Sequence, residues 1–373
     1  MGSCDVYSDF HCSIHWCYKN YWLDLSREDP QKIFTKPILS WWDEFGRKDL
    51  PWQKSPSLYK TWISEIMLQQ TQVKTVIPYF MNFITAYPNI DTLANAKDSE
   101  VMSYWSGLGY YSRARNLHKT AKIIQKKYEG RFPQEYEQII DLPGIGPSTG
   151  GAIVSLNKIE PRPIVDGNVK RVISRHFLIK GNLNSGPAKK KVWELSKLCT
   201  PNKNFHIYSQ AIMDLGATIC RPRNPQCSQC PVKQSCIAKK KNIIDEIPQR
   251  KLSKPKKKRE YYFLIIKNNN QLLLELRDSS GIWPGLWSFP IVDSIEEISK
   301  WVNSTLGLSM RSFEAETPFM HSLTHMDLKI NPIIINFDNQ KIKLSRKEIK
   351  YFDKKTIRTL GISKAVKIII DGL

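Results

Sequence analysis

Apolar residues recur every three or four positions from Ile38 to about Ile219, with Pro and Gly between the repeats. This spacing is typical of amphipathic helices that pack their apolar faces together. It predicts a mostly α-helical N-terminal body, which we place at residues 37–238. In one segment, ISEIMLQQTQVKTVIPYFMNFI, the positions expected to face inward are Ile63, Ile66, Met67, Val73, Ile77, Phe80 and Ile84.

The pattern changes toward the C-terminus. Residues 239–260 are rich in charge and poor in apolar side chains, which predicts a basic linker. Residues 261–277, YYFLIIKNNNQLLLELR, carry a strand–turn–strand signal. Helical spacing follows at 295–302, and LKINPIIINF returns to a strand pattern. We therefore expect a smaller α+β domain over residues 261–373.

The first 36 residues lack hydrophobic periodicity, and we predict a disordered N-terminal extension there. Cys12, His15 and Cys17 are conceivable metal ligands, but no second ligand pair follows at zinc-finger spacing. The extension has no basic region followed by an apolar stretch, unlike a secretory signal. No apolar run in the chain reaches the roughly 18 residues that span a bilayer. We expect a cytoplasmic, nucleoid-associated protein without a membrane partner.

The chain is strongly basic, with 56 Lys and Arg against 35 Asp and Glu in 373 residues, a net charge of +21. The basic residues are spread along the whole sequence, so a single localisation signal does not explain them. One explanation is a solubilising surface. The excess favours the other, a polyanionic partner such as nucleic acid.

Four cysteines stand close together in CRPRNPQCSQCPVKQSC, with the spacing Cys-x6-Cys-x2-Cys-x5-Cys. A disulfide knot, a zinc site and an iron–sulfur site are all candidates for such a group. A cytosolic chain keeps its thiols reduced, which nearly removes the disulfide alternative. The spacing alone leaves a metal site of either kind. The four residues are Cys220, Cys227, Cys230 and Cys236.

The segment LPGIGPSTGGAI, residues 142–153, has the composition of a tight hairpin between two helices. Gly144 and Gly146 permit the hairpin, and Pro147 suits the first position of the next helix. Backbone N–H groups exposed there would bind a phosphate without reading a base. An ordinary helix connection is the alternative.

Two carboxyl groups are candidates for acid–base chemistry. Asp166, in IVDGNVKRVISR, stands where a helix should begin, a position that favours the charged form. Glu65 stands among apolar residues, which would raise its pKa. Such opposite environments separate a proton donor from a permanent anion. A simple helix cap and an exposed first-turn glutamate are the structural alternatives. Residues 69–72 form an uncharged polar run, which we expect on a helix face. Side-chain amides there suit hydrogen bonds to the edges of bases.

Together these motifs resemble the adenine DNA glycosylases of the MutY type, within the endonuclease III superfamily. The resemblance covers nearly everything from residue 40 to residue 236, in family order. It rests on GRKDLPWQ, SEIMLQQTQV, GLGYYSRARNLHK, LPGIGPSTGGAI, VDGNVKRVISR, QAIMDLGATIC and the four cysteines.

The resemblance implies that the four cysteines ligate a 4Fe-4S cluster. Zinc sites usually come as two separated Cys pairs, whereas four thiolates in this array suit iron–sulfur. It further implies that Glu65 protonates a flipped adenine and that Asp166 stabilises the resulting sugar cation. Gln70 and Tyr110 would occupy the space in the duplex that the flipped adenine leaves. The remaining expected DNA contacts are Gly144, Gly146, Ser148, Asn168, Lys170, Arg221 and Arg223.

The sequence also departs from related enzymes in ways that bear on function. The bifunctional branch of the superfamily has a Schiff-base lysine where this chain has Ser148, so we expect hydrolysis without strand cleavage. Lys170 is a second amine near Asp166 that could trap an abasic product slowly. A non-catalytic iron–sulfur DNA-binding module is the other alternative, but it would not need both Glu65 and Asp166.

The C-terminal stretches SGIWPGLWSFP and HSLTHMDL resemble the Nudix-like domain with which this family detects 8-oxoguanine. No glutamate-rich Nudix box follows SFPIVD, so we do not expect a Nudix hydrolase. Leu323 replaces the usual aromatic residue, while Thr324 keeps a hydroxyl for lesion recognition. The implied partner is double-stranded DNA with adenine opposite 8-oxoguanine or guanine, bound by a monomer.

Overall fold

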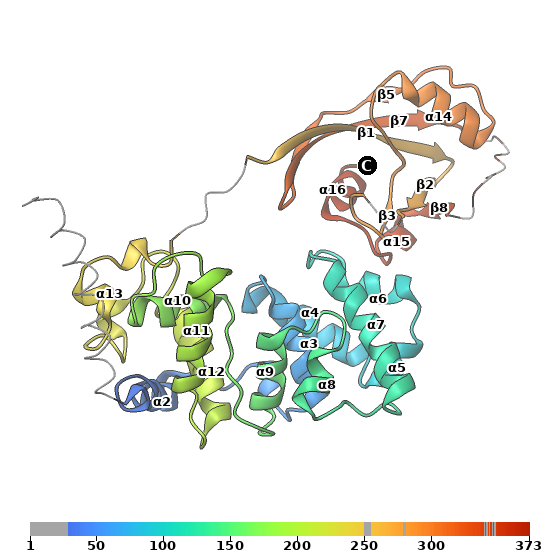
Figure 1. Ribbon diagram of the computed structural model, residues 1–373. Coiled ribbons are helices and arrows are strands. Elements are labelled where there is room, and N and C mark those ends of the chain that lie inside the picture. Colours follow the sequence, from blue (N-terminus) through green and yellow to red (C-terminus); the bar gives the residue numbers. More distant parts are fainter. Residues whose placement is uncertain are drawn as a thin grey trace, which may run out of the picture. The chain divides into compact units, whose positions relative to one another are not determined.

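The computed structural model describes residues 29–249, 255–278, 281–338, 340, 342, 344, 346 and 348–373 (Figure 1). Most of the predicted extension, including Cys12, His15 and Cys17, lies outside these residues, as does part of the predicted linker. The described chain forms two compact units. The first comprises residues 29–65 and 133–249, and the second comprises 66–132 and the described part of 255–373.

The first unit is helical, and α3 runs from it into the second. Its helical segments are η1 (Gln31–Thr35), α2 (Lys36–Phe45), η2 (Pro51–Gln53), α3 (Leu58–Leu68), α8 (Tyr136–Ile140), α9 (Pro147–Leu156), α10 (Gly167–His176), α11 (Gly186–Cys199), α12 (Phe205–Thr218), η3 (Cys227–Gln229), α13 (Ile237–Lys240) and η4 (Ile244–Glu246). The main core lies between α2, α9, α10, α11 and α12.

Helical structure begins earlier than the sequence suggested. The π-helical turn η1 occupies residues 31–35, which we had assigned to the N-terminal extension. Phe34 is fully buried, and its ring centroid lies 4.6 Å from that of His176 and 5.4 Å from that of Phe177. The core therefore extends to these residues because one aromatic ring packs under α10.

The segment 63–84 is not one helix. It contains the end of α3 and all of α4 (Val73–Ala86), and the polar run 69–72 lies in the connection between them. The prediction that this run lies on a helix face is therefore wrong. The break also changes the helical phase, so the fully buried positions of α4 are Val76, Phe80 and Phe83. Val73, Ile77 and Ile84 are only partly buried.

The second unit combines the helices of residues 73–127 with the C-terminal sheet and its own helices. Its helices are α4, α5 (Ile90–Asn95), α6 (Asp98–Trp105), α7 (Ser112–Lys127), α14 (Glu297–Leu306), α15 (Lys354–Ile357) and α16 (Lys364–Gly372). Its strands are β1 (Lys257–Asn268), β2 (Gln271–Leu276), β3 (Trp287–Ser288), β4 (Ile291–Val292), β5 (Glu314–Ala315), β6 (Phe319–Ser322), β7 (Met326–Asn336) and β8 (Ile349–Asp353). None of the helices described in either unit is long and apolar enough to cross a membrane.

The sheet has the central order β3-β2-β1-β7-β5, with β1 and β7 parallel and β1 and β2 forming an antiparallel hairpin. Alternating side chains of β1 and β7 pack against α14 in one core. The pairing of β1 with β7 starts at Lys257, inside the segment expected to be linker. The predicted class, a mostly helical body followed by a smaller α+β domain, is confirmed.

Candidate active site

Glu65 lies one turn before the end of α3 and is partly buried. Burial, together with the smaller effect of the charge of Asp166, raises the pKa of its carboxyl group from 4.5 to about 8. Trp62, Ile63 and Ile66, its neighbours on α3, are all buried. The carboxyl group therefore keeps its proton at neutral pH, as expected from its apolar neighbours.

Asp166 is the N-cap of α10 and is also partly buried. Its Oδ1 accepts a hydrogen bond from Val169 N at 2.7 Å, and its Oδ2 accepts one from Asn168 Nδ2 at 3.2 Å. Burial nevertheless raises its pKa, although these donors and the charge of Arg171 act in the opposite direction. The donors at the helix N-terminus favour the charged form, as expected, but desolvation is the larger effect and the pKa is raised overall.

The two carboxyl groups interact, and their surroundings differ. Burial and like charge both raise the pKa of Glu65, whereas Asp166 has donors aimed at both of its oxygens. When the pair holds one proton, we therefore place it on Glu65 and the negative charge on Asp166. This is the arrangement of a proton donor beside a fixed anion.

The hairpin between α8 and α9 has the local geometry that its glycines suggested. Gly144 has φ +82°, a left-handed conformation that suits glycine, and Gly146 is the N-cap of α9 with Pro147 next. A Cβ atom on Gly151 would lie 2.6 Å from Pro163 O, so α9 can approach the 160–165 segment only with glycine there. Ser148 Oγ accepts a hydrogen bond from Val165 N at 3.0 Å, next to Asp166.

Arg171 connects the Asp166 turn to the first cysteine. Its Nη2 donates to Asn168 Oδ1 at 2.8 Å and to Gly216 O at 2.6 Å. Its Nε donates to Cys220 O at 2.6 Å. Because Asn168 in turn donates to Asp166, one guanidinium group supports both the Asp166 turn and the cysteine loop. Sequence analysis missed this role, because the burial of Arg171, which is 8% exposed, results from tertiary packing.

The four cysteines of the 220–236 loop are free thiols, each partly buried. The pKa of Cys230 is raised to about 12, and burial is the main cause. The charges of Cys220, Cys236 and Cys227 also raise it, which shows that the four sulfur atoms lie close together. Arg175 Nη1 donates to Cys220 Sγ at 3.5 Å, so a cation lies against the first sulfur atom of the loop.

Among the described residues, no group of three or more His, Cys, Asp or Glu side chains is arranged to hold a metal ion. The fit of the cysteine loop to a metal group therefore rests on its chemistry. Four soft sulfur donors beside an arginine suit an iron–sulfur cluster, whose ligands are thiolates. Ligation would remove the thiol protons that burial otherwise retains.

The other candidate DNA contacts lie at the surface or near it. Arg223 is exposed, whereas Arg221 is half-buried and its Nη2 donates to Asn224 O at 3.2 Å. Lys170 Nζ donates to Asn184 Oδ1 at 2.8 Å, and burial lowers its pKa.

The residues expected to fill the space that the flipped base leaves, and the residue expected to contact the lesion, belong to the second unit. Gln70 lies in the connection between α3 and α4, and Tyr110 lies between α6 and α7; both are exposed. Thr324 is exposed in the turn between β6 and β7, where Leu323 N donates to Met326 O at 2.8 Å.

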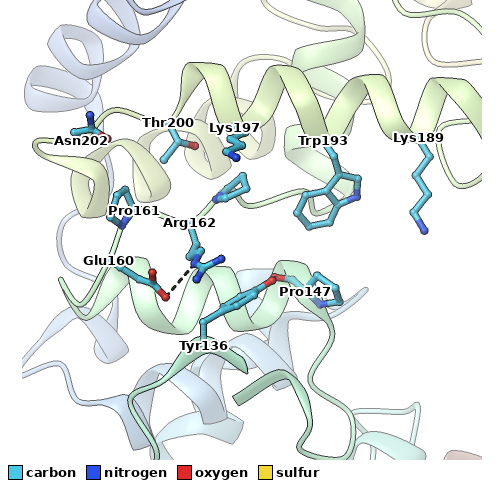
Figure 2. A pocket seen from close by; sticks show the side chains of 11 residues that line it. Tyr136, Pro147, Glu160, Pro161, Arg162, Lys189, Trp193, Lys197, Thr200 and Asn202 are labelled. Atoms are coloured by element: carbon cyan, nitrogen blue, oxygen red, sulfur yellow. Dashed lines mark hydrogen bonds and ion pairs between the residues drawn. The ribbon is translucent and has the colours of Figure 1, made fainter. Parts of the chain in front are cut away.

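A separate cavity of about 670 Å³ opens beside the hairpin in the first unit, as Figure 2 shows. Arg162 crosses it, with its Nε 3.0 Å from Glu160 Oε1 and its guanidinium carbon 4.1 Å from the centre of the Tyr136 ring. Neither Glu65 nor Asp166 lines this cavity. The cavity is therefore distinct from the pair of carboxyl groups.

The hairpin, the two carboxyl groups and the cysteine loop define a DNA glycosylase of base excision repair. Residues 63–201 match the HhH-GPD superfamily of base excision DNA repair proteins, and residues 261–372 match the NUDIX domain. An adenine DNA glycosylase of Buchnera aphidicola subsp. Schizaphis graminum (strain Sg) is 41% identical over 340 residues, 91% of this chain and 98% of that protein. The chain belongs to the adenine DNA glycosylases.

More distant relatives agree with this assignment. The human adenine DNA glycosylase is 38% identical over 217 residues, which cover 56% of this chain and 40% of that protein. The solved structure of a thermostable thymine-DNA glycosylase has a TM-score of 0.52 and 30% identity, and covers 57% of this chain and 97% of that one. The helical body thus has the fold of a DNA glycosylase.

Proposed function

We propose that this adenine DNA glycosylase hydrolyses the N-glycosidic bond of adenine paired with 8-oxoguanine or guanine, and that it does not cut the strand. The observation that carries the proposal is the pair of carboxyl groups, one with a pKa of about 8 and the other held by two hydrogen-bond donors. The acid donates a proton, and the anion stabilises a cation.

The target adenine must leave the base stack to reach these groups, at a cost of a few kcal/mol. Gln70 and Tyr110 fill the space that it vacates. Glu65 then protonates a ring nitrogen, so that adenine departs as a neutral molecule. Asp166 stabilises the oxocarbenium-like sugar, or bonds to it transiently, until water completes the hydrolysis and leaves an abasic site.

The absence of strand cleavage follows from the group beside Asp166. Ser148 offers a hydroxyl that already accepts a hydrogen bond from Val165 N, and a hydroxyl cannot form a Schiff base with the abasic sugar. Lys170 is the nearby amine, and its Nζ is bound to Asn184. We therefore assign Lys170 to DNA binding, with at most slow trapping of the product.

The cysteine loop would hold a 4Fe-4S cluster through Cys220, Cys227, Cys230 and Cys236. Bound there, the cluster would supply a rigid cross-link for the loop rather than redox chemistry on the substrate. The loop would then present Arg221 and Arg223 to phosphate groups. The hairpin at Gly144 and Gly146, together with Ser148, Asn168 and Lys170, would complete the DNA contact.

The remaining assignments concern domains and partners. We propose that the helical body, which begins at η1, is the glycosylase and that the sheet domain, which begins with β1 at Lys257, detects the lesion, with Thr324 offering a hydroxyl to 8-oxoguanine. A monomer is sufficient for this chemistry, since both carboxyl groups come from one chain. A chromosomal DNA substrate would place the protein in the cytoplasm, on the nucleoid.

An end-labelled duplex with adenine opposite 8-oxoguanine tests the proposal. After incubation with the enzyme, half of each sample is treated with alkali, which cuts at abasic sites. We expect cleavage only after alkali. Cleavage without alkali would show a lyase, and no cleavage in either sample would show that adenine is not removed.

A further inference from the structure

Two exposed side chains of the second unit are held in an unusual backbone conformation. Gln70 has φ +58° and Tyr110 has φ +50°, and 41% of the Tyr110 side chain is exposed. Residues other than glycine rarely adopt this left-handed region, because it brings Cβ close to the backbone. The surrounding structure must therefore hold both residues there.

Arg113, near the start of α7, holds the first of them. Its Nη1 lies 2.9 Å from Ile66 O, 2.8 Å from Met67 O and 2.6 Å from Gln69 O. The first two carbonyl groups belong to the last turn of α3, where no N–H group of the helix can reach them. A cation at this end also stabilises the helix dipole. Arg113 therefore ends α3 and fixes the peptide that leads into Gln70.

The same guanidinium group holds the second loop. Its Nη2 donates to Gly109 O at 3.1 Å, directly before Tyr110, and to Thr71 Oγ1 at 3.1 Å, directly after Gln70. Its central carbon lies 5.3 Å from the centre of the Tyr110 ring. Only 8% of Arg113 is exposed. The planar guanidinium group of arginine has several N–H donors in fixed directions and can donate to these separate acceptors at once. The ammonium group of lysine is a single point charge and cannot.

We propose that Arg113 is a positioning residue that fixes Gln70 and Tyr110 as one rigid unit, so that both enter the duplex together when the target nucleotide leaves the stack. This inference rests on the proposed function, in which these two side chains fill the vacated space. It adds that their geometry is set before DNA binds. A preorganised wedge loses less conformational freedom on insertion than two independent loops would.

The first test does not depend on adenine excision. Hydrogen exchange is measured on the full-length protein with its cluster, for the wild type, Arg113→Met and Arg113→Lys. Leu93→Ala serves as the control, because it removes volume from the buried face of α5, whose residues 90–95 lie outside both peptides. We expect both peptides, 69–72 and 107–112, to exchange at least about tenfold faster in Arg113→Met, one of them to do so in Arg113→Lys, and neither in the control. In Arg113→Met, acceleration of one loop alone, or of neither, would overturn the proposal.

The second test measures base flipping. A 2-aminopurine placed beside the target adenine brightens when the stack opens, and base release is followed in a single turnover. For Arg113→Met we expect the fluorescence rise to be lost and excision to slow by about 100-fold, as for other errors of positioning. Duplex affinity should change less than about threefold, because phosphate contacts dominate it.

The lysine variant separates positioning from charge. Arg113→Lys keeps the charge but reaches the acceptors of one loop only, so excision should stay slow. Full excision by Arg113→Lys, or by an Arg113→Met protein whose two loops exchange rapidly, would overturn the proposal. If even the wild type releases no adenine, the proposed function fails, while the exchange experiment still decides whether Arg113 fixes both loops.

Discussion

Replacing Glu65 with glutamine should stabilise the protein while removing its activity, and the stabilisation should grow with pH. Below pH 4.5 the folded and unfolded chains both carry the Glu65 proton. Between pH 4.5 and about 8 the unfolded chain releases this proton and the folded chain keeps it, so stability falls as pH rises. Glutamine has no proton to release, and the Glu65→Gln variant avoids this loss.

The magnitude follows from the raised pKa. A rise from 4.5 to about 8 implies a cost of about 2 kcal/mol at pH 6 and about 4 kcal/mol at pH 8. The gain in unfolding free energy of Glu65→Gln over the wild type should therefore increase by about 2 kcal/mol between these pH values. Glu44→Gln, an exposed substitution on α2, should show no such increase.

Urea unfolding of the three proteins at pH 6 and pH 8 provides this measurement, read from the midpoints at constant slope. Single-turnover excision by the wild type supplies the kinetic counterpart. It should fall roughly tenfold per pH unit above about pH 8, as Glu65 loses its proton. A stability gain that does not change with pH, or excision that rises through pH 8, would refute the assignment of Glu65 as a buried acid.

Three further substitutions follow from the contacts. Arg171→Met should lower excision by at least about tenfold, because Asn168 and Cys220 O lose their shared donor; unchanged single-turnover rates would contradict this role. Thr324→Ala should cost about 1 kcal/mol of binding to 8-oxoguanine duplex alone, measured by fluorescence anisotropy; an equal loss on guanine duplex would argue against lesion contact. Arg223→Ala should weaken all duplexes alike and reduce the salt slope by roughly one in a titration at several salt concentrations; a mismatch-specific change would mean base reading.

A point variant is a cleaner probe of the C-terminal domain than its deletion. Residues 66–132 and the described part of 255–373 form one compact unit. Within it, Ser106 Oγ donates to Ile362 O at 2.7 Å, and Arg115 Nη1 donates to Pro284 O at 2.8 Å. Deletion would therefore leave polar groups of α6 and α7 without partners, whereas Thr324 is exposed and its loss should leave the fold intact.

The parts of the fold that local pattern determines could be predicted from the sequence. The helical body, the hairpin at Gly144 and the strand pair around residues 268–271 follow from apolar periodicity and turn residues. The direction of the pKa shift of Glu65 follows mainly from its apolar neighbours in the chain, and Asp166 adds to it. These features depend on residues close together in sequence.

Features that depend on distant residues were missed. The end of α3 at Leu68 is set by Arg113, which lies 46 positions from Met67 in the chain. The pKa of Asp166 reflects burial in the folded body as well as its helix position. Tertiary contacts of this kind override local propensity, and periodicity within a single segment cannot reveal them.

Release of adenine by the two carboxyl variants tests the central claim most directly. Glu65→Gln and Asp166→Asn are compared with the wild type in a single turnover, on a duplex with adenine opposite 8-oxoguanine. Both variants should bind the duplex, and each should release adenine several orders of magnitude more slowly. Near-normal release by either variant would contradict the proposal that this pair of carboxyl groups carries out the reaction.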